Sequence, residues 1–245
     1  RLLSRSYPDG STVGFTYTPT GRRATATDAR GTTIYAYSAR DRLASLTYPD
    51  GRALEYGYDA GGNRTSLAAV LGSTRLTTTF AHDDAGRLDT VTDPRGQVYG
   101  HGYDANGNRA SLAYPNGVTT EYTYEANNRL TTLLTTHSPS ATVVQGYAYT
   151  LGLTGNRSRI DEHGGTVRAY AYDALYRLIR ETVSGGPLPA YEKEFAYDRA
   201  GNRQTQTTTG QGAATVSYAY DERDRLLTEN AVAYSFDVNG NLTGK

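Results

Sequence analysis

The residues of this chain that could do chemistry are four histidines and many carboxylates, and neither group has the spacing of a known site. His82 and His101 occupy aromatic positions in successive copies of a repeat, so a metal-binding or pH-sensing pair is the alternative to simple aromatic replacement. His137 and His163 fall in expected loops, without acidic or cysteine residues at ligand spacing. We therefore expect no metal and no cofactor.

The carboxylates follow the repeat. The string DANGN at 104–108 begins like a calcium loop but lacks the glycine at its sixth position and the glutamate at its twelfth, so it is predicted to be a turn. No G-x-S-x-G elbow, glycine-rich phosphate loop or cysteine nucleophile is present. A catalytic pair brought together by the array is the alternative. We expect solvated turn residues and no enzyme.

Composition restricts the partners. The chain has 245 residues with 22 Tyr and 27 Gly and no Cys, Met or Trp, so disulfides and zinc–thiolate sites are excluded. Its 25 basic and 25 acidic residues balance, which gives no electrostatic support for a nucleic-acid partner. No apolar run approaches the roughly 20 residues that span a bilayer, so no membrane insertion is expected.

The chain is a tandem repeat, and the elements that position these side chains follow from it. Eleven copies contain an aromatic-x-aromatic pair followed by a polar cluster such as YDAGGNR or YDANGNR, with most spacings between 20 and 25 residues. The second aromatic positions, called anchors here, are Tyr17, Tyr37, Tyr58, His82, Tyr103, Tyr124, Tyr149, Tyr172, Tyr197, Tyr220 and Phe236. The chain begins at Arg1 within the pattern, so we expect an internal piece of a longer protein.

Each copy predicts two strands and two turns. An aromatic-x-aromatic pair puts both rings on one face of a strand, and D-x-x-G-N/R is turn chemistry in which Asp caps the backbone and Gly or Asn accepts positive φ. The second turn is YPDG at 7–10 and 48–51, DPRG at 93–96 and YPNG at 114–117. We expect the structural motif to consist of the anchors together with turn residues that follow them. These turn residues are Asp59, Gly62, Asp104, Gly107, Asp173, Asp198, Gly201, Asp221, Asp237 and Gly240.

The pattern predicts an all-β protein, a repeat array of antiparallel β-hairpins over 1–245 without a dividing linker. Insertions at 130–149 and 183–197 are expected to lengthen hairpin loops, and 149–157 adds two residues before its Gly-Asn. Roughly 22 strands at ~4.8 Å would make a strip of ~105 Å, too wide to stay a flat open sheet. We therefore expect a curved single-layer sheet, an arc or turn of a hollow spiral.

Tyrosine suits such a wall, because its ring packs against neighbouring strands while its hydroxyl reaches a polar partner or water. The arginine that follows each turn could stack on a ring or pair with the turn aspartate of a neighbouring repeat. Both possibilities place the arginine between repeats.

The recurring YDANGNR, YDAGGNR, YDRAGNR and HDDAGRL, with YPDG or YPNG between them, resemble the tyrosine-aspartate (YD) repeats of RHS-repeat proteins. That family includes bacterial polymorphic toxins, wall-associated proteins, shell subunits of insecticidal toxin complexes and teneurins. The resemblance implies a β-solenoid of hairpins that forms a hollow shell around a C-terminal toxic domain. It also implies secretion or a bacterial cell-surface location, with the signal outside this piece.

Two departures limit the resemblance. The family's shell needs more than eleven repeats, and its self-cleaving plug carries Asp-Pro-x-Gly, whose letters recur at 93–96 in a turn position with further repeats behind them. Asp93 is therefore predicted to be a turn residue, and the plug and the toxin to be absent.

The leading functional hypothesis is a shell segment that encapsulates a toxin, with the other repeats and the C-terminal plug or toxin domain of the same protein as partners. The alternative is a cell-surface recognition module that binds glycans or a protein through exposed tyrosines. Open strand edges also predict edge-to-edge self-association.

Overall fold

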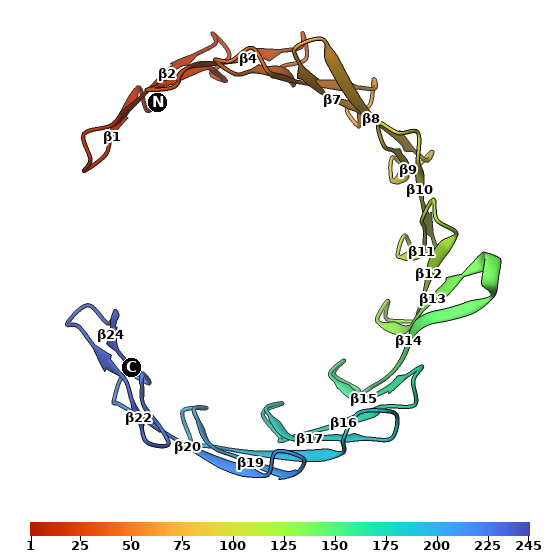
Figure 1. The fold of residues 1–245 in the computed structure, drawn as a ribbon, viewed down its shortest axis with the longest axis vertical. Coiled ribbons are helices and arrows are strands. Elements are labelled where there is room, and N and C mark those ends of the chain that lie inside the picture. The colour runs from red at the N-terminus through yellow and green to blue at the C-terminus, as the bar shows by residue number, and fades with distance from the viewer. The chain divides into compact units, whose positions relative to one another are not determined.

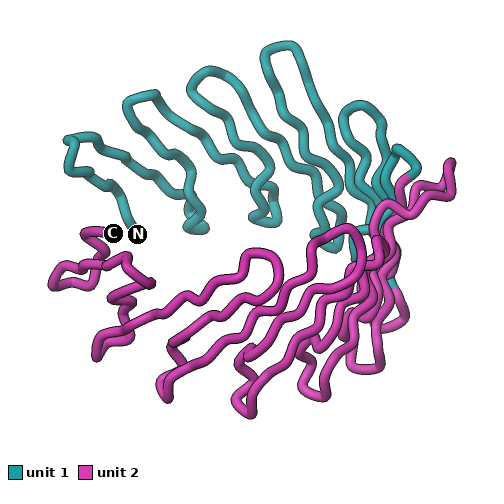
Figure 2. The backbone as a smooth tube through the Cα atoms, turned by 60° about the horizontal axis from the view of Figure 1, so that its bottom comes forward, with its two compact units in different colours: residues 1–103, 111–117 teal, residues 104–110, 118–245 magenta.

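Backbone pairing between consecutive strands builds the whole fold. The computed structural model describes residues 1–245 and contains 24 β-strands and one short 3-10 helix. The strands divide into two compact units, residues 1–103 with 111–117 and residues 104–110 with 118–245 (Figure 2). The sequence predicts one domain, a single repeat array over 1–245. This division by contacts does not test whether the repeats form one domain, so that remains a prediction.

The first unit carries ten strands in chain order. They are β1 (Ser4–Ser6), β2 (Thr12–Tyr17), β3 (Arg23–Asp28), β4 (Gly31–Tyr37), β5 (Leu43–Thr47), β6 (Ala53–Tyr58), β7 (Arg64–Leu71), β8 (Thr74–His82), β9 (Leu88–Thr92) and β10 (Val98–Tyr103). Each of the ten is antiparallel to the next. The following strand, β11 (Arg109–Ala113), has residues in both units.

The second unit continues the pattern. Its elements are β12 (Val118–Tyr124), β13 (Leu130–His137), η1 (Ser138–Ser140), β14 (Thr142–Leu151), β15 (Arg157–Glu162), β16 (Val167–Tyr172), β17 (Leu178–Ser184), β18 (Tyr191–Tyr197), β19 (Arg203–Gly210), β20 (Ala214–Tyr220), β21 (Leu226–Glu229), β22 (Val232–Ala233), β23 (Ser235–Phe236) and β24 (Leu242–Gly244). Strands β12 to β22 pair in sequence, and β23 with β24 forms a separate ribbon. The predicted all-β array of antiparallel hairpins is confirmed.

Each unit is a single layer of strands, because extensive strand contacts join consecutive strands (Figure 1). Its interior is correspondingly small. Ala68 and Val183 are the buried apolar side chains, and Thr120, Thr135 and Thr166 are the buried polar ones. Thr120 and Thr135 face each other across β12 and β13 with hydroxyls 2.9 Å apart. Cross-strand pairs and hydrogen bonds at the edges therefore have to supply what a thick core supplies elsewhere.

One prediction about the insertions is wrong. The insertion at 130–149 was expected to lengthen a loop, but β13 and β14 take up its length as strand and the connection is only η1 with Ala141. The reason is the β-branched sequence at the ends of both strands, which continues the ladder to His137 and Thr142. The insertion at 183–197 does form a loop, at 185–190 between β17 and β18.

Candidate functional site

A five-residue turn follows each aromatic pair, and in seven of the eleven copies an aspartate begins this turn. In 59–63, the Asp59 N–H donates to the carbonyl of Asn63 (3.0 Å) and the Gly62 N–H to the carbonyl of Asp59 (3.3 Å). The Asp59 carboxylate also accepts from the N–H groups of Gly62 and Asn63, at 2.6 and 2.8 Å. With Gly62 at a φ of +105°, this is a type I turn followed by a glycine bulge.

The same backbone bonds recur in all eleven copies. We call these segments YD turns; they are 18–22, 38–42, 59–63, 83–87, 104–108, 125–129, 152–156, 173–177, 198–202, 221–225 and 237–241. The proline-containing turns share the geometry, and Asp93 lies in one of them, accepting from the N–H groups of Arg95 and Gln97. Asp93 is therefore placed as a turn residue, as the sequence predicts.

The fourth position of the YD turn always has positive φ, and glycine fills it in seven turns. In the other four turns it is Asp41, Asn128, Tyr176 or Asp224, with φ between 58° and 61°. The repeat pattern predicts glycine or asparagine at this position, so the aspartate and tyrosine found here were not predicted. Aspartate could have been expected, because its short polar side chain tolerates the left-handed region.

The fifth residue of the turn returns to the aspartate of its own turn. Arg177 Nε donates to Asp173 Oδ2 at 2.7 Å, and Asn202 Nδ2 donates to Asp198 Oδ2 at 3.1 Å. The expected pairing with the aspartate of a neighbouring repeat is seen for Arg22 and Asp41, at 2.8 Å, but is wrong for most turns. The bulge brings residues four apart side by side, so the aspartate in the same turn is nearer than any other.

These contacts shift the titration of the turn aspartates. The pKa of Asp83 lies below its ordinary value, first because the Arg87 N–H donates to its carboxylate and then because the Arg87 guanidinium does. The pKa of Asp59 is lowered chiefly by the side-chain amide of Asn63. The carboxylates are thus held ionised as backbone acceptors, which is the opposite of what a general acid needs.

The anchor tyrosines close a gap between consecutive hairpins. The pairing of β5 with β6 begins at Thr47 opposite Ala53 and ends at Ser45 opposite Glu55. The carbonyl of Leu43 therefore lies beyond the end of this ladder. The hydroxyl of Tyr58 donates to that carbonyl at 3.0 Å. A backbone acceptor that the sheet leaves unpaired is therefore satisfied by a side chain of the next repeat.

Six other anchors make the same bond to the strand before them. The pairs are Tyr17 to Leu2 (2.6 Å), Tyr37 to Arg23 (2.8 Å), Tyr103 to Leu88 (2.9 Å), Tyr124 to Arg109 (2.9 Å), Tyr172 to Arg157 (2.8 Å) and Tyr197 to Leu178 (2.7 Å). The opening of the ladder and the tyrosine that closes it are thus properties of the repeat.

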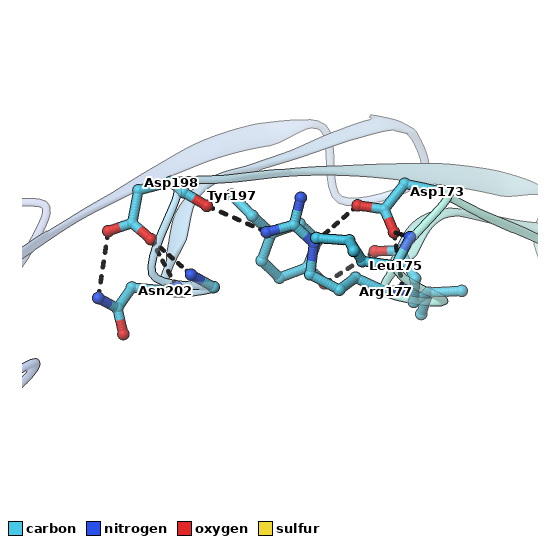
Figure 3. A network of polar contacts seen from close by, with 8 residues as sticks. Asp173, Leu175, Arg177, Tyr197, Asp198 and Asn202 are labelled. Carbon is cyan, nitrogen blue, oxygen red and sulfur yellow. Dashed lines mark hydrogen bonds and ion pairs between the residues drawn. The ribbon is translucent and has the colours of Figure 1, made fainter.

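Arginine reaches across the same gap. The guanidinium of Arg177, held by Asp173, lies 4.9 Å from the ring centroid of Tyr197 and donates to the carbonyl of Asp198 at 3.0 Å (Figure 3). The hydroxyl of Tyr197 in turn donates to the carbonyl of Leu178. One arginine and one tyrosine together connect the aspartate of one turn, the aromatic face and the backbone of the next turn. Stacking on a ring, which the sequence analysis proposed, is therefore seen.

Two predicted motif residues, Tyr149 and Phe236, differ from the pattern. Tyr149 pairs with Ile160, and it is Leu151 that lies opposite Arg157 where the other anchors lie, because the two inserted residues extend β14. Tyr149 instead stacks on Tyr147, with ring centroids 6.3 Å apart. Phe236 has no hydroxyl to donate, and the Arg225 guanidinium lies 5.0 Å from its ring.

The remaining chemical candidates are dispersed. His82 ends β8 and His101 lies on β10, with β9 between them. His137 Nδ1 and Ser140 Oγ are 2.7 Å apart in the hairpin tip, and His163 lies in a turn. No group of three or more His, Cys, Asp or Glu side chains is arranged to hold a metal ion. A membrane-crossing apolar helix is not among the elements.

Comparison with known proteins agrees with this geometry. The family model described as RHS Repeat matches residues 1–33, 37–74 and 103–143. Among solved structures, the chain is similar to a chain of the TcdB2-TccC3 crystal structure, with 17% identity over 99% of this chain and 19% of that one and a TM-score of 0.51. A TcdB2-TccC3-Cdc42 structure matches at 17% identity over 98% of this chain and 18% of that one, with a TM-score of 0.50. No curated protein matches.

The class of the protein is thus a tandem β-hairpin repeat with a tyrosine–aspartate turn edge. The RHS Repeat model matches just under half of the chain, which confirms the resemblance to RHS-repeat proteins drawn from its sequence. It spans about a fifth of the length of the solved chains that it matches.

The hydroxyl of Tyr58 can be tested by Tyr58→Phe, which leaves the Leu43 carbonyl without its donor. We expect a loss of about 0.5–1.5 kcal/mol in the free energy of unfolding, measured by urea titration. Tyr176→Phe is the matched control, because that ring is 62% exposed. Equal effects of the two substitutions would contradict the role of the hydroxyl.

Alkaline pH should lower the free energy of unfolding of the array. Burial raises the pKa of Tyr124 and Tyr172 above 10.0, and both hydroxyls donate to carbonyls, which a phenolate cannot do. Because the folded-state pKa is the higher one, this stability is complete below the ordinary pKa and is lost as the pH rises through the folded value. We expect the urea midpoint to be level near neutral pH and to fall above about pH 10. In Tyr124→Phe/Tyr172→Phe the fall should be shallower; an unchanged profile would refute the assignment.

Proposed function

We propose that this chain is a stretch of wall in a shell of RHS repeats, which encloses a C-terminal toxic domain of the same protein before delivery. The observation that carries the proposal is the single-layer array, in which anchor tyrosines and turn arginines join consecutive hairpins through bonds to backbone carbonyls. Such a construction favours an extended wall over a packed core.

A wall function agrees with the chemistry of the site. The turn carboxylates are engaged by N–H groups and by the fifth side chain of the turn, and the anchor hydroxyls by carbonyls. These groups therefore act in building the array, and we infer that the segment is non-catalytic.

The likeness to TcdB2-TccC3 supports a shell through the fold alone. A further structure among the matches, at 16% identity over 98% of this chain and 18% of that one and a TM-score of 0.51, is named as TcdB2-TccC3 without its hypervariable C-terminal region. We infer by analogy that the partners of this chain are other repeats and a variable C-terminal domain of its own protein. Secretion or display on a bacterial surface follows from the same proposal.

Limited proteolysis of the full reading frame that contains this segment tests the enclosure. We expect the C-terminal domain to resist protease in the intact protein and to become sensitive in a variant whose wall is opened by Tyr58→Phe, Tyr103→Phe and Tyr197→Phe together. The same domain expressed alone is the control. Equal digestion of the isolated and the intact forms would overturn enclosure while leaving the repeat fold in place.

A second function, recognition of glycans or a protein at the cell surface, is favoured by one observation. Tyr7, Tyr48 and Tyr114 each begin a proline turn, and they are 39%, 39% and 38% exposed. Aromatic rings presented at one edge of an array suit stacking on sugars.

A glycan array probed with this chain and with Tyr7→Ala/Tyr48→Ala/Tyr114→Ala tests the second function. Selective binding that the triple substitution abolishes would support recognition. If the chain is a passive wall, as the first proposal has it, both proteins should give the same background signal.

A further inference from the structure

We infer that consecutive YD turns are matched in two complementary classes, so that the turn edge of a hairpin fits only a neighbour of the corresponding class. The contacts involved lie between the fifth residue of one turn and the body of the next. The inference concerns how hairpins recognise one another and holds whether or not the wall encloses a toxin.

In the first class, an arginine at the fifth position donates forward to backbone. These bonds run from Arg42 Nη1 to the Asp59 carbonyl (3.2 Å), from Arg129 Nη1 to the Gly152 carbonyl (3.2 Å) and from Arg177 Nη1 to the Asp198 carbonyl (3.0 Å). Because the acceptor is a backbone carbonyl, the receiving turn needs no particular side chain. It needs only room for the guanidinium.

That space is a glycine at the fourth position of the receiving turn. A Cβ on Gly62 would collide with the Arg42 guanidinium, and one on Gly155 would lie 3.1 Å from Arg129 Nη1. Gly201, after Arg177, has a similar φ of +99° but nothing within 4 Å of its Cβ direction. Backbone conformation alone therefore requires glycine at all three places, and the arginine adds a second requirement at two of them.

In the second class, the fifth residue donates forward to a side chain. Asn108 Nδ2 donates to Asn128 Oδ1 at 2.8 Å, Asn202 Nδ2 to Asp224 Oδ1 at 2.7 Å, and Arg22 Nε to Asp41 Oδ2 at 2.8 Å. The receiving residue is the fourth of its turn, with φ between 58° and 60°. This explains why these turns tolerate the strain of a non-glycine residue: the side chain there is the acceptor for the preceding hairpin.

The two classes follow each other along the chain. Turn 104–108 donates an amide to 125–129, which then donates an arginine to the glycine-containing turn 152–156. Turn 59–63 instead precedes 83–87, whose fourth residue is Gly86, and Asn63 donates to Asp59 within its own turn. Asn63, which precedes a glycine-containing turn, thus makes no forward hydrogen bond, and we expect this contact between hairpins to be weaker than the matched ones.

A charge exchange tests the second class. Asn202→Asp removes the bonds to Asp198 and Asp224 and brings three carboxylates together, whereas Asn63→Asp removes the equivalent bond to Asp59 and brings only two together. We expect Asn202→Asp to raise the unfolding equilibrium constant roughly threefold to tenfold more than Asn63→Asp does, in urea titration. Adding Asp224→Asn should recover the excess loss in the Asn202→Asp background and nothing in the Asn63→Asp background. Equal losses, or no selective recovery, would overturn the inference.

The first class has an independent test that survives if a variant of the second fails to fold. Gly62→Ala and Gly201→Ala carry the same backbone strain, but only the former displaces an arginine. We expect Arg42→Ala to remove most of the extra loss caused by Gly62→Ala, so that the two substitutions together cost less than their sum. The pair Arg42→Ala with Gly201→Ala should be additive. Additivity in both pairs would show that the glycine serves the backbone alone.

Discussion

The structure depends on how backbone carbonyls are satisfied where two hairpins separate. The ladder between repeats ends before the turn edge, and an acceptor such as the Leu43 carbonyl would be left without a partner there. The hydroxyl of Tyr58 supplies the donor, and the guanidinium of Arg42 lies 5.7 Å from its ring. A polar group that loses its partner is costly, so the repeat must supply a long side chain with a hydroxyl at this position.

This constraint explains the composition of the chain. A leucine at an anchor would pack against its neighbours but could not donate, as Leu151 illustrates where it takes the position of an anchor. The aspartate that follows the anchor organises the turn that returns the chain, and it holds the fifth residue that crosses to the next repeat. Tyrosine, aspartate and arginine therefore recur together because they contact one another. The aspartate holds the arginine, and the arginine lies against the ring of the next tyrosine.

A thin structure of this kind distributes its stability along its length. With Val183 and Ala68 as its buried apolar side chains, no central core dominates, and each seam contributes through a few directional bonds. We expect the strength of each contact between hairpins to depend on two residues, the fifth of one YD turn and the fourth of the next. Several arginines, such as Arg87 and Arg177, are paired with the aspartate of their own turn.

The sequence by itself determined the all-β class, the hairpin repeat, both turns and the capping role of aspartate, because these depend on local spacing and on the conformational preferences of Gly, Pro and Asp. It could not determine which aspartate each arginine would meet, that β13 and β14 would extend as strands, or that Leu151 would replace Tyr149 in the register. Those features arise from contacts between segments far apart in the chain, such as Tyr58 with Leu43 and Asn202 with Asp224. Only the tertiary structure decides them, because a hydrogen bond between two repeats depends on how their strands are aligned as well as on their residues.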